Sequence, residues 1–263
     1  ARTASSLQAM VDVLGEYAAE KGLTINVKKS KVMRHGRSGV DPQISLNGQV
    51  LECVSEFRYL GMLFTQSCAL KKAVDNWAGP MMGANREVLT VGEEMGVKRM
   101  PHAMLKLFQT FVIPYGMYAS QVWGTRFIGS WQKGGKGLWK TEVEKRHMGF
   151  LKLVLGVKRS VCHDAIAWET GQTPLQFYWL RACTNFWNQM VSSDNQVLRE
   201  AVAADLLLMD AEGGKGRQCW CSEFAAALPR EMRSRVALIR GSPAGEVQVS
   251  AVEVQWQCSG SGV

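Results

Sequence analysis

The sequence predicts an α+β fold, in which a small β-rich block is followed by a mostly helical region. Short apolar runs between residues 21 and 64 are separated by turn signals of the kind found in hairpins. From Ser67 onward, apolar residues recur with the 3.6-residue period of helices. The chain has 263 residues, of which 46% are hydrophobic and 21% charged, and this composition is typical of a globular protein with one or two domains.

The first expected element is a helix near the start of the chain. Ser5 and Gln8 have the spacing of a capping box, with Ser5 at the N-cap. Gly22 supplies the left-handed residue that commonly ends a helix. The apolar residues between them fall on one helical face, and they are Leu7, Met10, Val11, Leu14, Tyr17 and Ala18.

Short strands are expected next. Leu23, Ile25 and Val27 alternate with polar residues, which is the period of a half-buried strand. After a loop over residues 34–43, Asn47-Gly48 between two apolar runs predicts a hairpin, because a type I′ turn needs two residues with positive φ. A second turn is expected at Gly61.

The remainder of the chain is expected to be helical. Pro101 should begin one helix and Pro114 should end or kink it. Gly156 and Gly171 should end two more, and Pro174 should open a long one. We expect helices near 70–77, 101–113, 143–155, 164–170, 174–186 and 197–209. A loop is expected over 129–137, a linker over 213–216, and a disordered tail after Cys258.

The positive charge of the chain is concentrated in two stretches. The formal net charge is +8. Residues 21–37 hold six Lys and Arg and no acid, and residues 126–159 hold nine against two glutamates. Clustered cations are typical of phosphate contacts in nucleic-acid binding. The candidate cations are Lys28, Lys29, Lys31 and Arg34 in the first stretch, and Arg126, Lys133, Lys136, Lys140, Lys145 and Arg146 in the second.

Each charged stretch also has a structural explanation. Cations on an edge strand oppose aggregation without binding anything. In the second stretch Trp131 and Trp139 could stack on bases of a single strand, or they could belong to the core beneath a solvated helix face. Both alternatives remain open from the residues alone.

The cysteines and the hydropathy pattern indicate a reduced, intracellular protein. The seven cysteines are scattered and odd in number, which argues against a disulfide framework. Cys219 and Cys221 do not have the paired four-ligand spacing of a zinc site. No signal peptide or membrane-spanning run is evident, so we expect a nuclear or cytoplasmic location and no membrane partner.

Several short motifs occur in an order that resembles a known family. They are Gly22-Leu23-Thr24-Ile25-Asn26, Lys29-Ser30-Lys31, Asn47-Gly48 and Phe57-Arg58-Tyr59-Leu60-Gly61. This order resembles motifs D and E of the reverse transcriptases of non-LTR (LINE-type) retrotransposons, and a weaker likeness continues to about Met190. The resemblance implies a palm-edge fragment over 1–66, thumb-like helices over 67–125, a basic connector over 126–212 and an undefined segment over 213–263.

The resemblance also implies roles for individual residues. Lys29 matches the motif D lysine, a candidate general acid for the departing pyrophosphate. Lys28, Lys31 and Arg34 would contact phosphates. Tyr59-Leu60-Gly61 would form the primer grip, where glycine permits a close approach of the backbone.

The sequence departs from this family at the catalytic metal site. The family's Asp-Asp pair precedes the helix that leads into motif D, and none of the seven aspartates here is adjacent to another. The resemblance therefore implies an RNA-directed DNA polymerase fragment that lacks the upstream polymerase region. Its partners would be an RNA template and a DNA primer. Mg²⁺ would belong to the complete polymerase, and the chain alone should not polymerise. The alternatives are a non-catalytic nucleic-acid-binding module derived from such an element and a basic helical scaffold.

Overall fold

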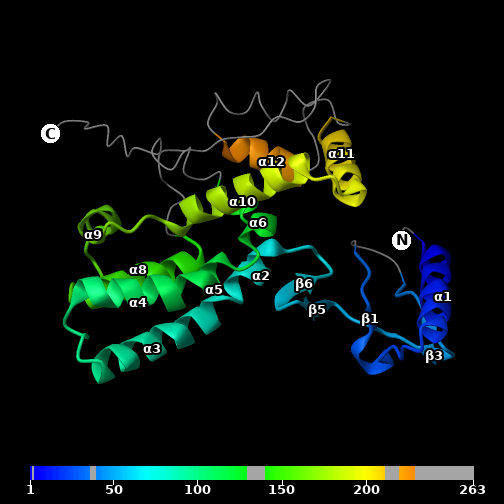
Figure 1. Cartoon of the computed structure of the whole chain (residues 1–263), viewed down its shortest axis with the longest axis horizontal. Coiled ribbons are helices and arrows are strands. Elements are labelled where there is room, and N and C mark those ends of the chain that lie inside the picture. Colours follow the sequence, from blue (N-terminus) through cyan, green and yellow to red (C-terminus); the bar gives the residue numbers. More distant parts are fainter. Residues whose placement is uncertain (2, 36–39, 129–139, 211–218, 229–263) are drawn as a thin grey trace. The chain divides into compact units, whose positions relative to one another are not determined.

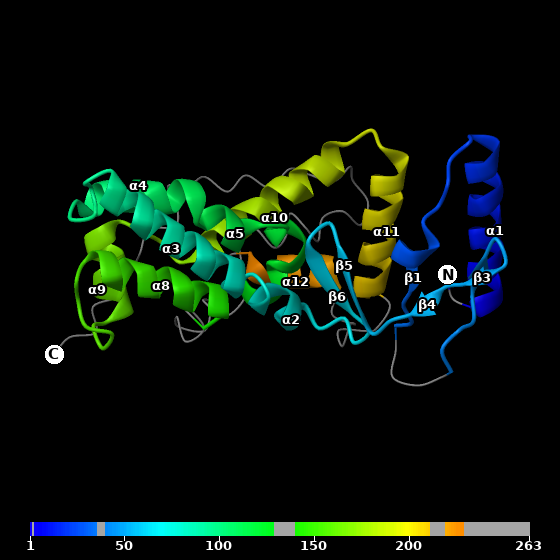
Figure 2. The ribbon, with the colours of Figure 1, turned by 90° about the horizontal axis from the view of Figure 1, so that it is seen from below.

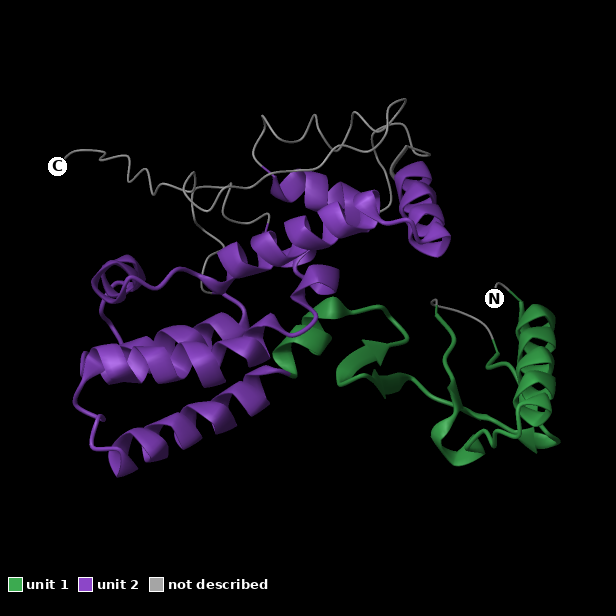
Figure 3. Ribbon diagram, in the orientation of Figure 1, with its two compact units in different colours: residues 1–76 green, residues 77–263 purple. Residues whose placement is uncertain are grey.

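A computed structural model describes residues 1, 3–35, 40–128, 140–210 and 219–228, apart from the side chains of 209 and 210 (Figure 1). The contacts divide the chain into two compact units, residues 1–76 and 77–263 (Figure 3). Each sheet in the described ranges has two strands, and helices make up most of the structure. The fold is therefore mixed α+β, as the sequence predicts. Within those ranges, no helix is both long and apolar enough to cross a bilayer.

Unit 1 holds short elements along the first 76 residues. The helices are α1 (Ala4–Glu20), a 3₁₀ turn η1 (Val27–Lys29) and α2 (Leu70–Asp75). The strands are β1 (Lys31–Val32), β2 (Ser45–Leu46), β3 (Gln49–Val50), β4 (Glu52–Cys53), β5 (Glu56–Tyr59) and β6 (Met62–Thr65). β1 pairs in parallel with β4, while β2–β3 and β5–β6 are antiparallel hairpins.

Both predicted hairpin turns are confirmed. Asn47 and Gly48 have φ of 52° and 77°, which is the pair of positive angles that a type I′ turn requires. Leu60 and Gly61 repeat this pattern with φ of 48° and 81° between β5 and β6. Leucine carries a Cβ and is disfavoured in the left-handed region, so the tip of the second hairpin is locally strained.

A small apolar core holds α1 to the first hairpin. Its buried members are Val32, Ile44, Leu46 and Leu51. The Gln8 side chain accepts a hydrogen bond from the Ser45 backbone N–H (2.9 Å) and donates one to the Ser45 carbonyl (2.8 Å). This pair of bonds connects α1 to β2 and gives Gln8 a role other than capping.

Two local predictions in this unit are wrong. The N-cap of α1 is Thr3, and the capping box pairs it with Ser6, because the helix begins at Ala4 and not beyond Ser5. The expected strand from Leu23 to Lys28 is absent. The Asn26 side chain accepts the Lys29 amide (3.1 Å) and closes η1 locally, so no partner strand is bonded there. Ile25 and Val27 nevertheless pack against the core.

Unit 2 is helical throughout its described part. Its helices are α3 (Ala78–Glu94), α4 (Pro101–Phe111), α5 (Ile113–Met117), α6 (Ser120–Trp123), α7 (Thr125–Ile128), α8 (Glu142–Val154), α9 (His163–Thr170), α10 (Leu175–Ser192), α11 (Gln196–Asp210) and α12 (Trp220–Ala227). Figure 2 shows α3, α4 and α8 next to one another, and each of these three helices contacts the other two. α10 packs on α5, α6 and α7, and α12 packs on α7 and α11.

The helix boundaries predicted from proline and glycine are confirmed. Pro101 occupies the first turn of α4, and Pro114 lies in the first turn of α5, directly after α4 has ended. Gly156 and Gly171 have φ of 67° and 64° and follow the ends of α8 and α9. The predicted loop at 129–137, the linker at 213–216 and the tail after Cys258 lie outside the described residues. α12 was not predicted.

Tryptophan side chains fill the centre of unit 2. Trp123 and Trp179 are buried with ring centroids 4.9 Å apart, and the Trp179 indole N–H donates to the Gly116 carbonyl (2.8 Å). Trp187 stacks on Trp220 at 6.3 Å, which places α12 against α10. These contacts hold the short helices α5, α6 and α12 against α10.

Candidate nucleic-acid interface

The four cations of the first basic stretch do not share one environment. Lys28 and Lys29 are exposed on η1. Lys31 forms an ion pair with Glu52 across the β1–β4 ladder, and Arg34 Nε lies 3.3 Å from Asp41 Oδ1. Lys28 and Lys29 therefore present unpaired cations, as far as the described residues show, whereas Lys31 and Arg34 also stabilise the fold of unit 1.

The β5–β6 hairpin places the three expected primer-grip residues at its tip. Tyr59 is opposite Met62 in the register, and Leu60 and Gly61 form the turn between them. The exposed fractions of Tyr59 and Leu60 are 58% and 73%. The side chains at this hairpin tip are exposed, and Gly61 has no Cβ. Another molecular surface can therefore come close to the backbone of the turn.

The cations of the second basic stretch also differ in their environments. Arg126 on α7 lies 3.3 Å from Glu223 on α12, so it joins two helices of the fold. Lys145 pairs with Glu142 at 2.6 Å, one turn earlier on α8. Lys140 and Arg146 are exposed. Lys133 and Lys136, with Trp131 and Trp139, lie outside the described residues.

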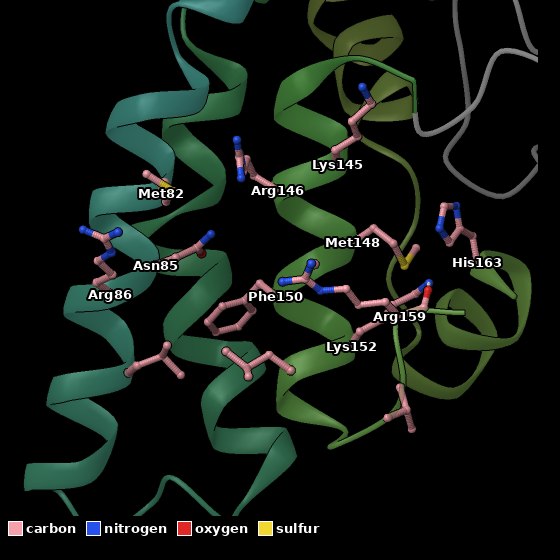
Figure 4. A pocket seen from close by; sticks show the side chains of 14 residues that line it. Met82, Asn85, Arg86, Lys145, Arg146, Met148, Phe150, Lys152, Arg159 and His163 are labelled. Carbon is pink, nitrogen blue, oxygen red and sulfur yellow. Dashed lines mark hydrogen bonds between the residues drawn. The ribbon is translucent and has the colours of Figure 1, made fainter. Parts of the chain in front are cut away.

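A groove of about 750 Å³ lies between α3, α8 and the segment that leads into α9 (Figure 4). Its lining includes five Lys or Arg side chains, one histidine and no carboxylate. Two of these cations, Lys145 and Arg146, are candidates from the sequence. The full lining is Met82, Asn85, Arg86, Leu89, Lys145, Arg146, Met148, Gly149, Phe150, Lys152, Leu153, Val157, Arg159 and His163.

The five cations that line the groove differ in their hydrogen-bond and ion-pair partners within the chain. Lys152 is buried and its Nζ donates to the carbonyls of Arg159 and Val161, both at 2.6 Å. It therefore fixes the segment after α8 and does not reach a ligand. Arg86, Arg146 and Arg159 have no ion-pair partner within the described ranges. These three guanidinium groups are exposed, and each is suited to bidentate phosphate contacts.

His163 stands at the α9 side of the groove. Partial burial lowers its pKa, and the nearby Lys152 charge lowers it further, while Asp164 opposes both effects. The imidazole is therefore neutral at physiological pH and can accept or donate a hydrogen bond.

The opposite side of α8 forms a polar core layer. Glu144 is fully buried and lies 3.3 Å from the Gln176 amide nitrogen, and the Thr141 side chain caps the helix by accepting the Glu144 amide. His147 stacks on Phe108 with ring centroids 5.2 Å apart, and burial lowers its pKa to about 3. Both side chains face away from solvent, so they position α8 and contact no ligand.

The family resemblance implies an adjacent aspartate pair at the magnesium site of a complete polymerase. No two aspartates of this chain are adjacent. In the part of the chain that the structure describes, no three His, Cys, Asp or Glu side chains gather to hold a metal ion.

Sequence reasoning found part of this groove. The nine-cation stretch contains Lys152 and Arg159, but nothing in the sequence singled out their positions. Arg86 and Asn85 lie on α3, far from that stretch, and only the packing of α3 on α8 brings them there. A cationic residue on the exposed face of a helix gives no signal of its own.

No protein-family model, curated protein sequence or solved structure matches the chain.

Proposed function

We propose that this chain is the palm-edge and thumb portion of a non-LTR retrotransposon reverse transcriptase, and that it binds the RNA template and DNA primer. The observation that carries the proposal is the groove of unit 2, where Arg86, Arg146 and Arg159 lie together without a carboxylate. A protein surface whose charge serves only solubility would mix both signs. Guanidinium groups without an ion-pair partner in a concave surface favour a ligand that carries several negative charges.

The proposal assigns a second contact to unit 1. The exposed tip of the β5–β6 hairpin would approach the sugar-phosphate backbone of the primer with Leu60 and Gly61. Lys28 and Lys29 would add phosphate contacts from η1, and Lys29 would be the candidate proton donor in a complete polymerase. Lys31 and Arg34 contribute less in this proposal, because an ion pair already neutralises each of them.

Binding to an RNA/DNA hybrid at several salt concentrations tests the proposal. Each phosphate contact contributes about 0.9 to the slope of log affinity against log salt. Reversing Arg86, Arg146 and Arg159 to glutamate should therefore weaken binding and flatten the slope by about 3. Fluorescence anisotropy of a labelled hybrid measures both quantities.

A matched triple variant controls for net charge. Arg99, Lys106 and Arg181 are exposed in the same unit and do not line the groove. Their reversal to glutamate changes the formal charge by the same amount but should keep most of the slope. Equal losses in the two triple variants would refute the groove as the binding site, and absence of any salt-dependent binding would refute the proposed function.

A basic helical scaffold is the second candidate, and ion pairs favour it. Arg126, Lys145, Lys31 and Arg34 all pair with acids of the same chain. In a scaffold these cations would act only within the fold. The two triple variants separate the two functions, because the non-specific attraction between a basic scaffold and nucleic acid should weaken equally in both.

A further inference from the structure

Unit 1 contains a cysteine–histidine pair that is independent of the groove. Cys68 lies between β6 and α2, and His35 follows β1 in the sequence. The Cys68 Sγ is 3.3 Å from His35 Nδ1, and both residues are exposed. Thirty-three residues separate them in the chain, so the tertiary fold brings the thiol to the imidazole.

Hydrogen bonds order the backbone at Cys68 and at the end of the strand that precedes His35. The Cys68 amide donates to the Thr65 carbonyl (2.9 Å), and the Ala69 amide donates to the buried Thr65 hydroxyl (3.0 Å). On the other side, the Val54 amide donates to the Val32 carbonyl (2.8 Å) and extends the β1–β4 ladder toward His35. Each residue of the pair lies three positions beyond the end of a strand, Cys68 after β6 and His35 after β1.

We propose that Cys68 is a reactive thiol and the site at which small disulfides modify this chain, with His35 as its base. An imidazole within hydrogen-bond distance of a thiol can accept its proton as the sulfur attacks. The sulfur then bonds to one sulfur of the disulfide, the S–S bond breaks, and the other half leaves as a thiolate. The proton that His35 accepted is available to that leaving thiolate, so charge and atoms balance and no further oxidant is needed.

The other described cysteines lack this arrangement. Cys183, Cys219 and Cys221 are buried, and burial raises the pKa of the Cys183 thiol to about 12. Cys162 is exposed like Cys68, and no hydrogen bond between its sulfur and an imidazole is found among the described residues. Cys162, at the N-cap of α9, is therefore the comparison for an exposed thiol without a hydrogen-bonded imidazole.

The test is the rate of modification at each cysteine of the full chain. An aromatic disulfide is added at neutral pH, and peptide mass spectrometry follows Cys68 and Cys162 separately. We expect Cys68 to react about tenfold faster, which is less than the 10²–10⁴-fold that a base positioned in an active site typically contributes. His35→Gln should bring Cys68 to the rate of Cys162, whereas His102→Gln, at an exposed histidine elsewhere, should leave it unchanged.

Two results would overturn the inference. One is an equal rate at Cys68 and Cys162 in the parent chain, and the other is an unchanged Cys68 rate in His35→Gln. A repeat in denaturant separates folding from chemistry, because both cysteines should then react alike in every variant. This outcome does not depend on nucleic-acid binding, so the inference and the proposed function can fail separately.

Discussion

Replacement of Lys152 by methionine tests how the groove is built. The Lys152 ammonium is buried and donates two hydrogen bonds of 2.6 Å to carbonyls of the segment that carries Arg159. Methionine keeps most of the apolar stem and loses both bonds. The variant therefore isolates the polar contribution of one side chain to the shape of the groove.

The expected loss follows from the two bonds and what offsets them. A hydrogen bond from a charged donor contributes about 1.5–3 kcal/mol. Methionine avoids the cost of burying an ammonium group, and this gain offsets part of the loss. We expect a net destabilisation of about 2 kcal/mol, which lowers the melting temperature of a unit of this size by about 4–8 °C.

Thermal unfolding followed by circular dichroism measures this change. Lys158→Met, at an exposed lysine in the same segment, is the control and should shift the melting temperature by less than about 1 °C. The Lys152 variant should also lose hybrid affinity, because Arg159 is no longer held at the groove. A Lys152→Met melting temperature equal to that of the control would refute the assignment of Lys152 as the residue that fixes this segment.

Two further predictions concern the core of unit 2. The pKa of His147 is lowered to about 3, so the unfolded chain binds a proton between about pH 6.5 and pH 3 that the folded chain does not. The free energy of unfolding should fall as the pH drops through this window, by up to about 1.4 kcal/mol per pH unit. Denaturant titrations at several pH values should show that this pH dependence is missing in His147→Phe. The same pH dependence of stability in the variant and the parent would contradict the prediction. A Cβ at Gly124 would meet the Ser120 carbonyl and lie 3.0 Å from the Trp179 Cβ, so Gly124→Ala should destabilise by about 1–3 kcal/mol. Gly83→Ala has open space within α3 and should stabilise by about 0.5–1 kcal/mol, and the same sign in both alanine variants would contradict this account of Gly124.

Elements with local determinants could be predicted from the sequence. The Asn47-Gly48 turn and the proline at the start of α4 depend on backbone preferences within a few residues, and both predictions are confirmed. The expected strand after Leu23 is wrong because a strand needs a partner. At this position the Asn26 side chain instead accepts a hydrogen bond from the Lys29 amide, which closes a local turn in place of a strand.

The groove could be predicted only in part, because its residues come from distant segments. Arg146 belongs to a visible cluster of cations, but Arg86 joins it through the packing of α3 on α8. The same reason explains Arg126, which looked like a binding residue until Glu223, 97 residues later, proved to be its partner. The pattern of charged residues in the sequence gives the sign of the charge on a surface. Tertiary contacts decide which of those charges are paired within the fold and which can contact a ligand.

The distribution of ion pairs is the strongest physical reason to expect a ligand at the groove. Like charges held close together in a concave surface repel one another, and this repulsion opposes folding. Elsewhere in the described chain, acids relieve such repulsion, as Glu52 does for Lys31 and Glu223 for Arg126. At the groove Glu142 pairs with Lys145, but no acid of the described residues forms an ion pair with Arg86, Arg146 or Arg159. Glu144 is instead buried on the far side of the helix, so the fold leaves the Arg86, Arg146 and Arg159 charges for an anion to neutralise.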